Sequence, residues 1–203
     1  MKEKLLSICI NLIKKNNPYI KNTKIEEIKY GLEGIYLTLT KLGFILIASI
    51  ALGIVKEFFF FLLFYNIIRV FAFGIHASKN SVCLVISLLV FLLCPYIALT
   101  LSIPMLIKII ISSFCILAII FYAPADTHKR PLINSKKRLR LKFFSLFIAV
   151  FYVFLAFYIN NSFLANILIL ALLVEVILIL PTTYKLFHLP YNNYRNYNLT
   201  LNN

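Results

Sequence analysis

The chain has 203 residues, of which 62% are hydrophobic, and its 21 basic and 7 acidic residues give a formal net charge of +14. Soluble domains are about 45–50% apolar, so this composition excludes an ordinary soluble globular protein. The basic residues lie in short segments between long apolar runs, which indicates membrane topology rather than nucleic-acid binding. We therefore expect an all-α polytopic membrane protein, because helices satisfy the backbone in lipid.

The first 30 residues carry seven lysines and three glutamates, with leucine and isoleucine at helical spacing between them. This pattern predicts an amphipathic helix on the inner membrane surface. A break at Pro18 and a second short polar helix are expected to follow it.

Long apolar runs predict about six spans in the rest of the chain. They cover about residues 34–55, 58–73, 82–103, 105–122, 143–159 and 163–180. A polar, basic loop at 123–142 separates the fourth span from the fifth, and residues 182–203 form a polar tail that we expect to be loosely ordered. The sequence thus predicts a single membrane domain over 1–203, with its spans within 34–181.

Lysine and arginine counts orient the spans in the cell membrane. The N-terminal segment and the 123–142 loop each hold seven basic residues. Six spans place both segments on one side, together with the turn at 74–81 and the C-terminal tail. Because basic loops stay in the cytoplasm, both termini and His76 are expected there.

One polar segment, FGIHASKNSVC at 73–83, interrupts the apolar sequence. In a continuous helix the Cα atoms of His76 and Cys83 would be about 10 Å apart, so a working pair needs a break between them. Gly74 is suited to end one helix and Ser81 to cap the next. Cys83 would then lie in a first turn, where the helix dipole favours a thiolate, and His76 would be a general base and acid. From the spacing alone, a polar hairpin with an incidental His and Cys is the more ordinary interpretation.

These residues also suggest a family. The pattern R-x4-G-x-H-A-x5-C, in which six residues separate the histidine from the cysteine, is formed by Arg69, Gly74, His76, Ala77 and Cys83. It resembles the signature of AgrB, the membrane cysteine endopeptidase of Gram-positive accessory gene regulator quorum sensing. The segments YGLEGIY at 30–36 and APADTHKRPL at 123–132 extend the resemblance over nearly the whole chain. One departure is Phe73, where the family commonly has the first of two glycines, and it would stiffen the turn.

The resemblance implies a specific chemistry. Cys83 would be the nucleophile and His76 the acid/base of a thiol protease that cleaves the C-terminal part of a short propeptide, AgrD. The peptide would be held as a Cys thioester and released as a thiolactone or lactone ring, an autoinducing peptide. No metal or cofactor is expected, and the cysteine spacing lacks the pairs typical of zinc sites. A homodimer fits a small polytopic enzyme.

Three further residues are candidates for supporting the pair. Arg69 would add positive potential that favours a thiolate, or extend to the membrane edge. Asp126 would orient His76 or cap the turn after Pro124, and the structural role is favoured. Glu33 would pair with a lysine, line the substrate path or orient His76, and the sequence does not choose among these.

The basic loop at 123–142 has two candidate partners. The first is anionic membrane lipid, which positive loops bind as an anchor, and this role is favoured. The second is the acidic part of an AgrD-like propeptide, for which Lys129 and Arg130 are the best substrate-binding candidates in this resemblance.

The main alternative to a peptidase is a small polytopic transporter or lipid-binding protein. Glu33, Arg69 and Glu175 would then form a polar pathway, and Cys83 would be incidental. Glu175 lies inside the sixth predicted span, so we expect it to face the interior, toward Lys108 or a subunit contact, or to be protonated.

Overall fold

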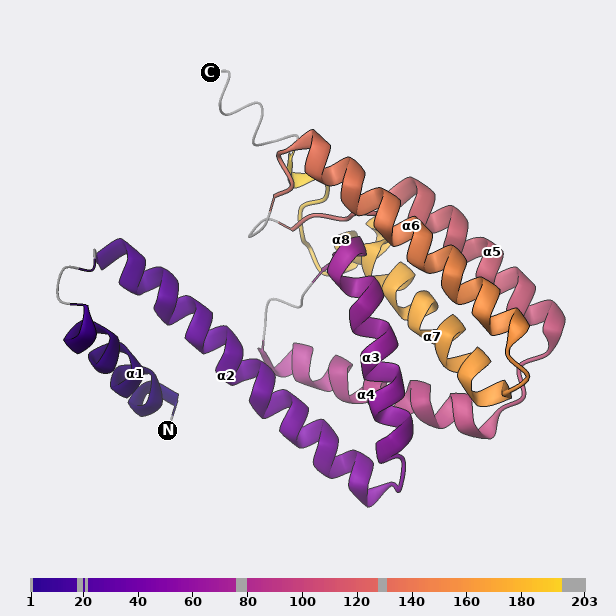
Figure 1. Ribbon diagram of the computed structural model, residues 1–203, viewed down its shortest axis with the longest axis horizontal. Helices are drawn as coiled ribbons and strands as arrows, with labels where there is room; N and C mark the ends of the chain where they lie inside the picture. The colour runs from indigo at the N-terminus through magenta and orange to yellow at the C-terminus, as the bar shows by residue number, and fades with distance from the viewer. Residues whose placement is uncertain (1, 18–19, 21, 76–79, 128–130, 195–203) are drawn as a thin grey trace. The chain divides into compact units, whose positions relative to one another are not determined.

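A computed structural model describes residues 2–17, 20, 22–75, 80–127 and 131–194, and these residues form helices joined by loops (Figure 1). The helices are α1 (Lys2–Asn16), α2 (Asn22–Ala51), α3 (Val55–Ala72), α4 (Asn80–Thr100), α5 (Met105–Tyr122), α6 (Ser135–Tyr158), α7 (Ser162–Ile179) and α8 (Pro181–Leu186). The chain divides into two compact units, Met1–Ala48 and Ser49–Asn203.

The first unit holds α1 and most of α2. Helix α1 matches the predicted amphipathic helix, and it leaves Leu5, Ile8 and Leu12 exposed. The sequence also predicted a separate short polar helix before residue 34. This prediction is wrong, because α2 runs unbroken for 30 residues. Its polar start is rich in Glu, Lys, Ile and Leu, which propagate a helix well enough to outweigh Gly31 and Gly34, at about 1 kcal/mol each.

Helix α7 is the centre of the second unit and contacts α3, α4, α5 and α6 (Figure 1). After its first residue, and apart from Asn166 and Glu175, its sequence is apolar around the whole helix, and a helix of this kind is stable only when other helices surround it. Almost all of its residues from Ala165 to Val176 are buried. The surrounding helices instead expose many large apolar side chains, as expected for surfaces that face lipid.

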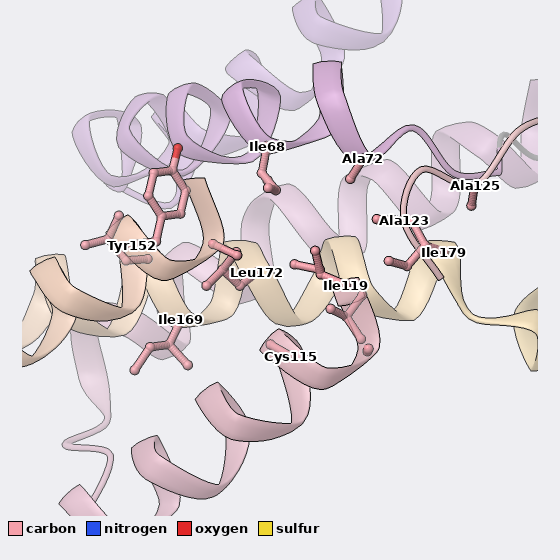
Figure 2. Packing of buried hydrophobic residues seen from close by; sticks show 14 of the residues in the cluster. Ile68, Ala72, Cys115, Ile119, Ala123, Ala125, Tyr152, Ile169, Leu172 and Ile179 are labelled. Carbon is pink, nitrogen blue, oxygen red and sulfur yellow. The ribbon is translucent and has the colours of Figure 1, made fainter. Parts of the chain in front are cut away.

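The core of the second unit joins α3, α5, α6 and α7 (Figure 2). Ile119 of α5 and Leu172 and Ile179 of α7 lie within one buried cluster, together with Ala72 at the end of α3. Several of its members are alanines, which let helix backbones approach closely in a membrane. This close packing brings the end of α3 next to the end of α7.

Among the described residues, five helices are long and apolar enough to cross a membrane, which confirms a polytopic membrane protein. These helices are Lys24–Ala51, Ser81–Thr100, Met105–Tyr122, Ser135–Tyr158 and Ser162–Ile179. The second predicted span corresponds to α3, which has 18 residues but carries Lys56, Glu57 and Arg69. Helix α3 packs against α4, α6 and α7, so it belongs to the same bundle.

Two boundaries differ from the sequence prediction. Helix α6 begins at Ser135, eight residues before the predicted span, because Lys, Arg and Leu are good helix formers and the Asn134 side chain accepts from Lys137 N at 3.1 Å. The tail is not loosely ordered up to residue 194: α8 covers Pro181–Leu186, and Tyr184 and Asn193 are buried.

Candidate active site

The segment that leads to His76 leaves α3 through two residues with positive φ. Phe73 has φ 64° and ψ −127°, and Gly74 has φ 103°. A Cβ at Gly74 would meet the Arg69 guanidinium and would lie 3.0 Å from Leu178 O and 3.2 Å from Ile179 Cγ2. Only glycine fits this backbone without displacing its neighbours, which accounts for Gly74 at the end of the helix.

Main-chain hydrogen bonds hold residues 73–75 on two sides. Gly74 N donates to Ala125 O at 2.9 Å, and Ala125 N donates to Ala72 O at 2.9 Å, which forms a short parallel bridge. Ile75 N donates to Leu178 O at 3.2 Å, at the end of α7. The chain therefore enters the His76 segment from an anchored base, between the 123–132 loop and α7.

Arg69 adds a third attachment to this base. Its guanidinium donates to Phe73 O, to Ile75 O and to the carboxylate of Glu175 at 3.3 Å. The Arg69 side chain is 11% exposed and that of Glu175 is fully buried, so the pair lies inside the protein. Glu175 faces the interior as predicted, but its partner is Arg69 rather than Lys108, because α3 packs directly against α7. We call Arg69, Glu175 and the bound carbonyls the Arg69 clamp.

Cys83 lies in the first turn of α4, as the sequence predicted, and is half-buried. The helix begins at Asn80, so Ser81 is inside it rather than before it, and the expectation of Ser81 as the cap is wrong. His76 lies outside the described residues, and so do Lys129 and Arg130. Their roles stay predictions.

Asp126 connects the polar loop to the C-terminal segment. Its side chain is 3% exposed and accepts from three backbone amides, Leu132 N at 3.3 Å, Asn193 N at 3.0 Å and Tyr194 N at 2.8 Å. A carboxylate with these partners is well satisfied without a histidine. The contacts agree with the structural interpretation of Asp126, although they join two segments rather than cap a turn.

Tyr184 of α8 supports the same connection through its hydroxyl group. Its hydroxyl donates to Asp126 O at 2.9 Å and lies 3.2 Å from Ala125 O. Burial raises the pKa of Tyr184 well above its usual value, so the phenol stays a donor across the physiological range. Because Ala125 also binds Gly74, Tyr184 acts on the base of the His76 segment through the loop.

Glu33 is half-buried in α2, within the unit formed by Met1–Ala48. Its proposed role toward His76 stays a prediction. Across the described residues, no group of three or more His, Cys, Asp or Glu side chains is placed to hold a metal ion.

Comparison with known proteins gives the family of this chain. The family model described as Accessory gene regulator B matches residues 7–179. The chain belongs to the accessory gene regulator B family. It is 32% identical to an AgrB-like protein of Clostridium acetobutylicum, over 92% of this chain and 90% of that protein. It is 31% identical to an AgrB-like protein of Listeria monocytogenes, over 84% of each chain.

A third relative of this AgrB family member is the accessory gene regulator protein B of Staphylococcus carnosus, which is 30% identical over 68% of this chain and 71% of that protein. No solved structure matches the chain. The range matched by the AgrB model contains Cys83 and both charged residues of the Arg69 clamp, whereas Tyr184 and Asn193 lie beyond it.

Sequence reasoning on this AgrB family member missed the clamp and the role of Tyr184. A signal for the clamp was present, because a buried Arg and a buried Glu inside membrane helices usually pair with each other. No comparable signal marked Tyr184 or Asn193, since both lie in a segment of ordinary polar composition.

Proposed function

We propose that the protein is a membrane cysteine endopeptidase that processes an AgrD-like quorum-sensing propeptide. The observation that carries this proposal is the position of Cys83 in the first turn of α4, in a chain of the accessory gene regulator B family. The amide groups of a first turn point toward a negative charge, and this end of the helix favours a thiolate. His76 lies seven residues before Cys83, in the segment that leaves the anchored base.

The first half of the proposed reaction is an acyl transfer. His76 takes the thiol proton, and the Cys83 sulfur attacks the scissile carbonyl carbon of the propeptide. The C–N bond breaks, a C–S thioester forms, and His76 returns the proton to the leaving amine. The C-terminal part of the propeptide is released.

The second half closes the ring. A thiol or hydroxyl within the bound peptide attacks the thioester carbonyl and gives its proton to His76. The new ester or thioester forms a lactone or thiolactone, and the protonated Cys83 thiol is restored. A site that excludes water favours ring closure over hydrolysis, because the thioester then meets only the tethered nucleophile.

In this mechanism Arg69 is a positioning residue. Its guanidinium binds the carbonyls of Phe73 and Ile75, which belong to the three residues directly before His76. The clamp would therefore set where the His76 segment starts without contacting the substrate. Lys129 and Arg130 are proposed to bind the acidic part of the propeptide, and a homodimer is proposed as the assembly.

The transporter alternative needs Arg69 and Glu175 to line a polar pathway. Both side chains are instead bound to each other, and Arg69 also holds two backbone carbonyls. Charged groups that are bound to each other and to the backbone are not available to bind a transported substrate, so this arrangement favours the peptidase.

The test uses the full-length protein in nanodiscs with a synthetic propeptide of the AgrD class, and mass spectrometry of cleaved peptide and of the thioester-bound protein. We expect Cys83→Ser and His76→Ala to abolish cleavage, a loss of about 10³-fold or more. The matched control is Cys94→Ser in the same helix, which should retain activity. Cleavage at the normal rate by Cys83→Ser would overturn the proposal.

A further inference from the structure

A cavity of about 380 Å³ lies where α5 ends and α6 begins, beside the C-terminal segment. Arg138 and Lys142 of α6 line it, one helical turn apart, together with Ser135. Tyr194 and Asn192 line it from the C-terminal segment. Its volume is within the range of about 300–1,000 Å³ that small-molecule sites have.

The cations at this cavity have no acidic partner nearby in the sequence. Five of the first eight residues of α6 are Lys or Arg, and its first turn holds no acidic residue. From residue 58 to residue 203 the only acidic residues are Asp126 and Glu175. Asp126 is occupied by three backbone amides and Glu175 by Arg69. The start of α6 therefore carries positive charge that these two carboxylates do not neutralise.

The helix dipole increases this imbalance. The N-terminal end of a helix is itself positive, so basic side chains in the first turns destabilise the helix unless an anion lies close to them. Asn134 satisfies one amide of this end, that of Lys137, but supplies no charge. An anion in the cavity would offset both the dipole and the side-chain charges.

Arg138 is held in a geometry that suits an oxyanion. Its guanidinium carbon lies 3.8 Å from the ring centroid of Tyr194. Stacking on a ring uses the face of the guanidinium and leaves the N–H donors in its plane for a second partner. Lys142 adds an ammonium on the same face of α6, because residues four apart are neighbours on a helix.

The side chains around the cavity suit a lipid better than a soluble anion, because several of them are apolar and exposed. Phe121 and Leu139 line it and are 72% and 70% exposed, and Phe143 follows on α6 at 65% exposed. Helices α5 and α6 pack side by side and are both candidate membrane spans (Figure 1). The polar cavity therefore opens beside apolar side chains on which acyl chains can lie.

We propose that this cavity binds the headgroup of an anionic phospholipid, with its phosphodiester between Arg138 and Lys142 and its acyl chains along the exposed faces of α5 and α6. Ser135 and Asn192 provide polar groups for the hydroxyls of a glycerol headgroup. The bound lipid would join the start of α6 to the C-terminal segment, which Asp126 links to the 123–132 loop. This site is independent of the proposed peptidase activity.

The experiment measures lipid binding to the full-length protein in an uncharged detergent by native mass spectrometry. The probes are short-chain phosphatidylglycerol, phosphatidylcholine of the same chain length, inorganic phosphate and a glutamate-rich peptide. We expect saturable binding of one phosphatidylglycerol and at least about tenfold weaker binding of the other three.

Two double variants remove the same charge from the same helix. Arg138→Gln with Lys142→Gln should weaken phosphatidylglycerol binding by about tenfold or more, because two charge-assisted contacts are lost. Lys136→Gln with Lys137→Gln is the matched control, since neither residue lines the cavity, and should change binding less than about threefold. Ser135→Trp keeps every charge but fills the cavity, so it should also block phosphatidylglycerol binding. This variant tests the site independently if Arg138→Gln with Lys142→Gln does not fold.

Four results would overturn the proposal. Equal weakening by both double variants would show diffuse charge attraction, and equal binding of phosphatidylcholine would show an apolar site. Inorganic phosphate that binds as tightly as the lipid would show a free-anion site. Tighter binding of the acidic peptide would show a peptide-docking surface.

Discussion

Phe73 holds a backbone conformation that glycine adopts freely and other residues adopt only under strain. Its φ of 64° with ψ of −127° lies outside the regions that L-residues favour. Strained residues of this kind cost about 1–3 kcal/mol and persist only where the surroundings enforce them. Here the enforcing groups are the Arg69 guanidinium, bound to Phe73 O, and the bridge to Ala125.

This strain predicts that glycine is more stable than alanine at position 73, whereas alanine is the more stable of the two inside a helix. At position 73, Phe73→Gly should be more stable than Phe73→Ala by about 1 kcal/mol or more, because both remove the ring and only glycine relaxes the backbone. At Phe71, inside α3, alanine should be the more stable by about 1 kcal/mol. Denaturant unfolding in mixed micelles measures both pairs, and the same order at the two positions would contradict the assigned strain.

Gly74 and Gly53 form a second matched pair. Both have positive φ, but a Cβ at Gly53 meets nothing within 4 Å, whereas one at Gly74 meets Arg69 and Leu178 O. Gly53→Ala should cost about 1–2 kcal/mol from backbone strain alone. Gly74→Ala should cost about 1–3 kcal/mol more, from overpacking, and should also reduce propeptide cleavage. Equal costs in the same unfolding assay would show that the space around Gly74 is not restrictive.

At the scale of helices, the Arg69 clamp joins the end of α3 to α7 and to the segment that follows α3. The two charged residues are 106 positions apart in the chain. Removing one partner of a buried ion pair typically costs about 3–5 kcal/mol, because the other charge stays buried and unpaired. Replacing both with apolar residues is often neutral.

The clamp therefore predicts a separation of stability from activity. Arg69→Met alone should destabilise the fold by about 3–5 kcal/mol, and adding Glu175→Met should recover most of this loss. Cleavage should stay low in the double variant, because the carbonyls of Phe73 and Ile75 still lack their donor. Unfolding curves and thioester yield measure the two effects, and full recovery of thioester yield would assign Arg69 a purely structural role.

At the scale of the whole molecule, the number of membrane crossings decides which loops share a side of the membrane. In the part of the chain that the structure describes, five helices meet the length and apolarity of a span, and α3 has the length but carries three charged residues. Its place in the bundle against α4, α6 and α7 supports a sixth crossing. An even number of crossings would put both termini on the same side of the membrane, and the lysine and arginine bias predicts that this side is the cytoplasm.

Cysteine accessibility in intact cells tests this topology. In a chain without its native cysteines, we expect Lys56→Cys and Asn160→Cys to react with an impermeant thiol reagent added outside. Lys4→Cys and Lys137→Cys should react only after the membrane is permeabilised. If Lys4→Cys reacted in intact cells while Lys137→Cys did not, α3 would not span the membrane.

The sequence by itself determined the membrane class, the amphipathic α1, most of the spans and the position of Cys83 in a first turn. These features depend on local patterns, namely apolar run length, helical spacing and the residues that end or begin a helix. The start of α6 was missed because basic residues that are good helix formers were assigned to a loop by their charge.

Only the tertiary structure decided which distant groups meet. It paired Glu175 with Arg69, gave Asp126 the amide of Asn193, 67 residues away, and set Ala125 beside Gly74. Local patterns predict that a buried charge needs a partner but not which helix supplies it. That choice follows from the packing of α3 against α7, which depends on the shapes of all the surrounding side chains at once.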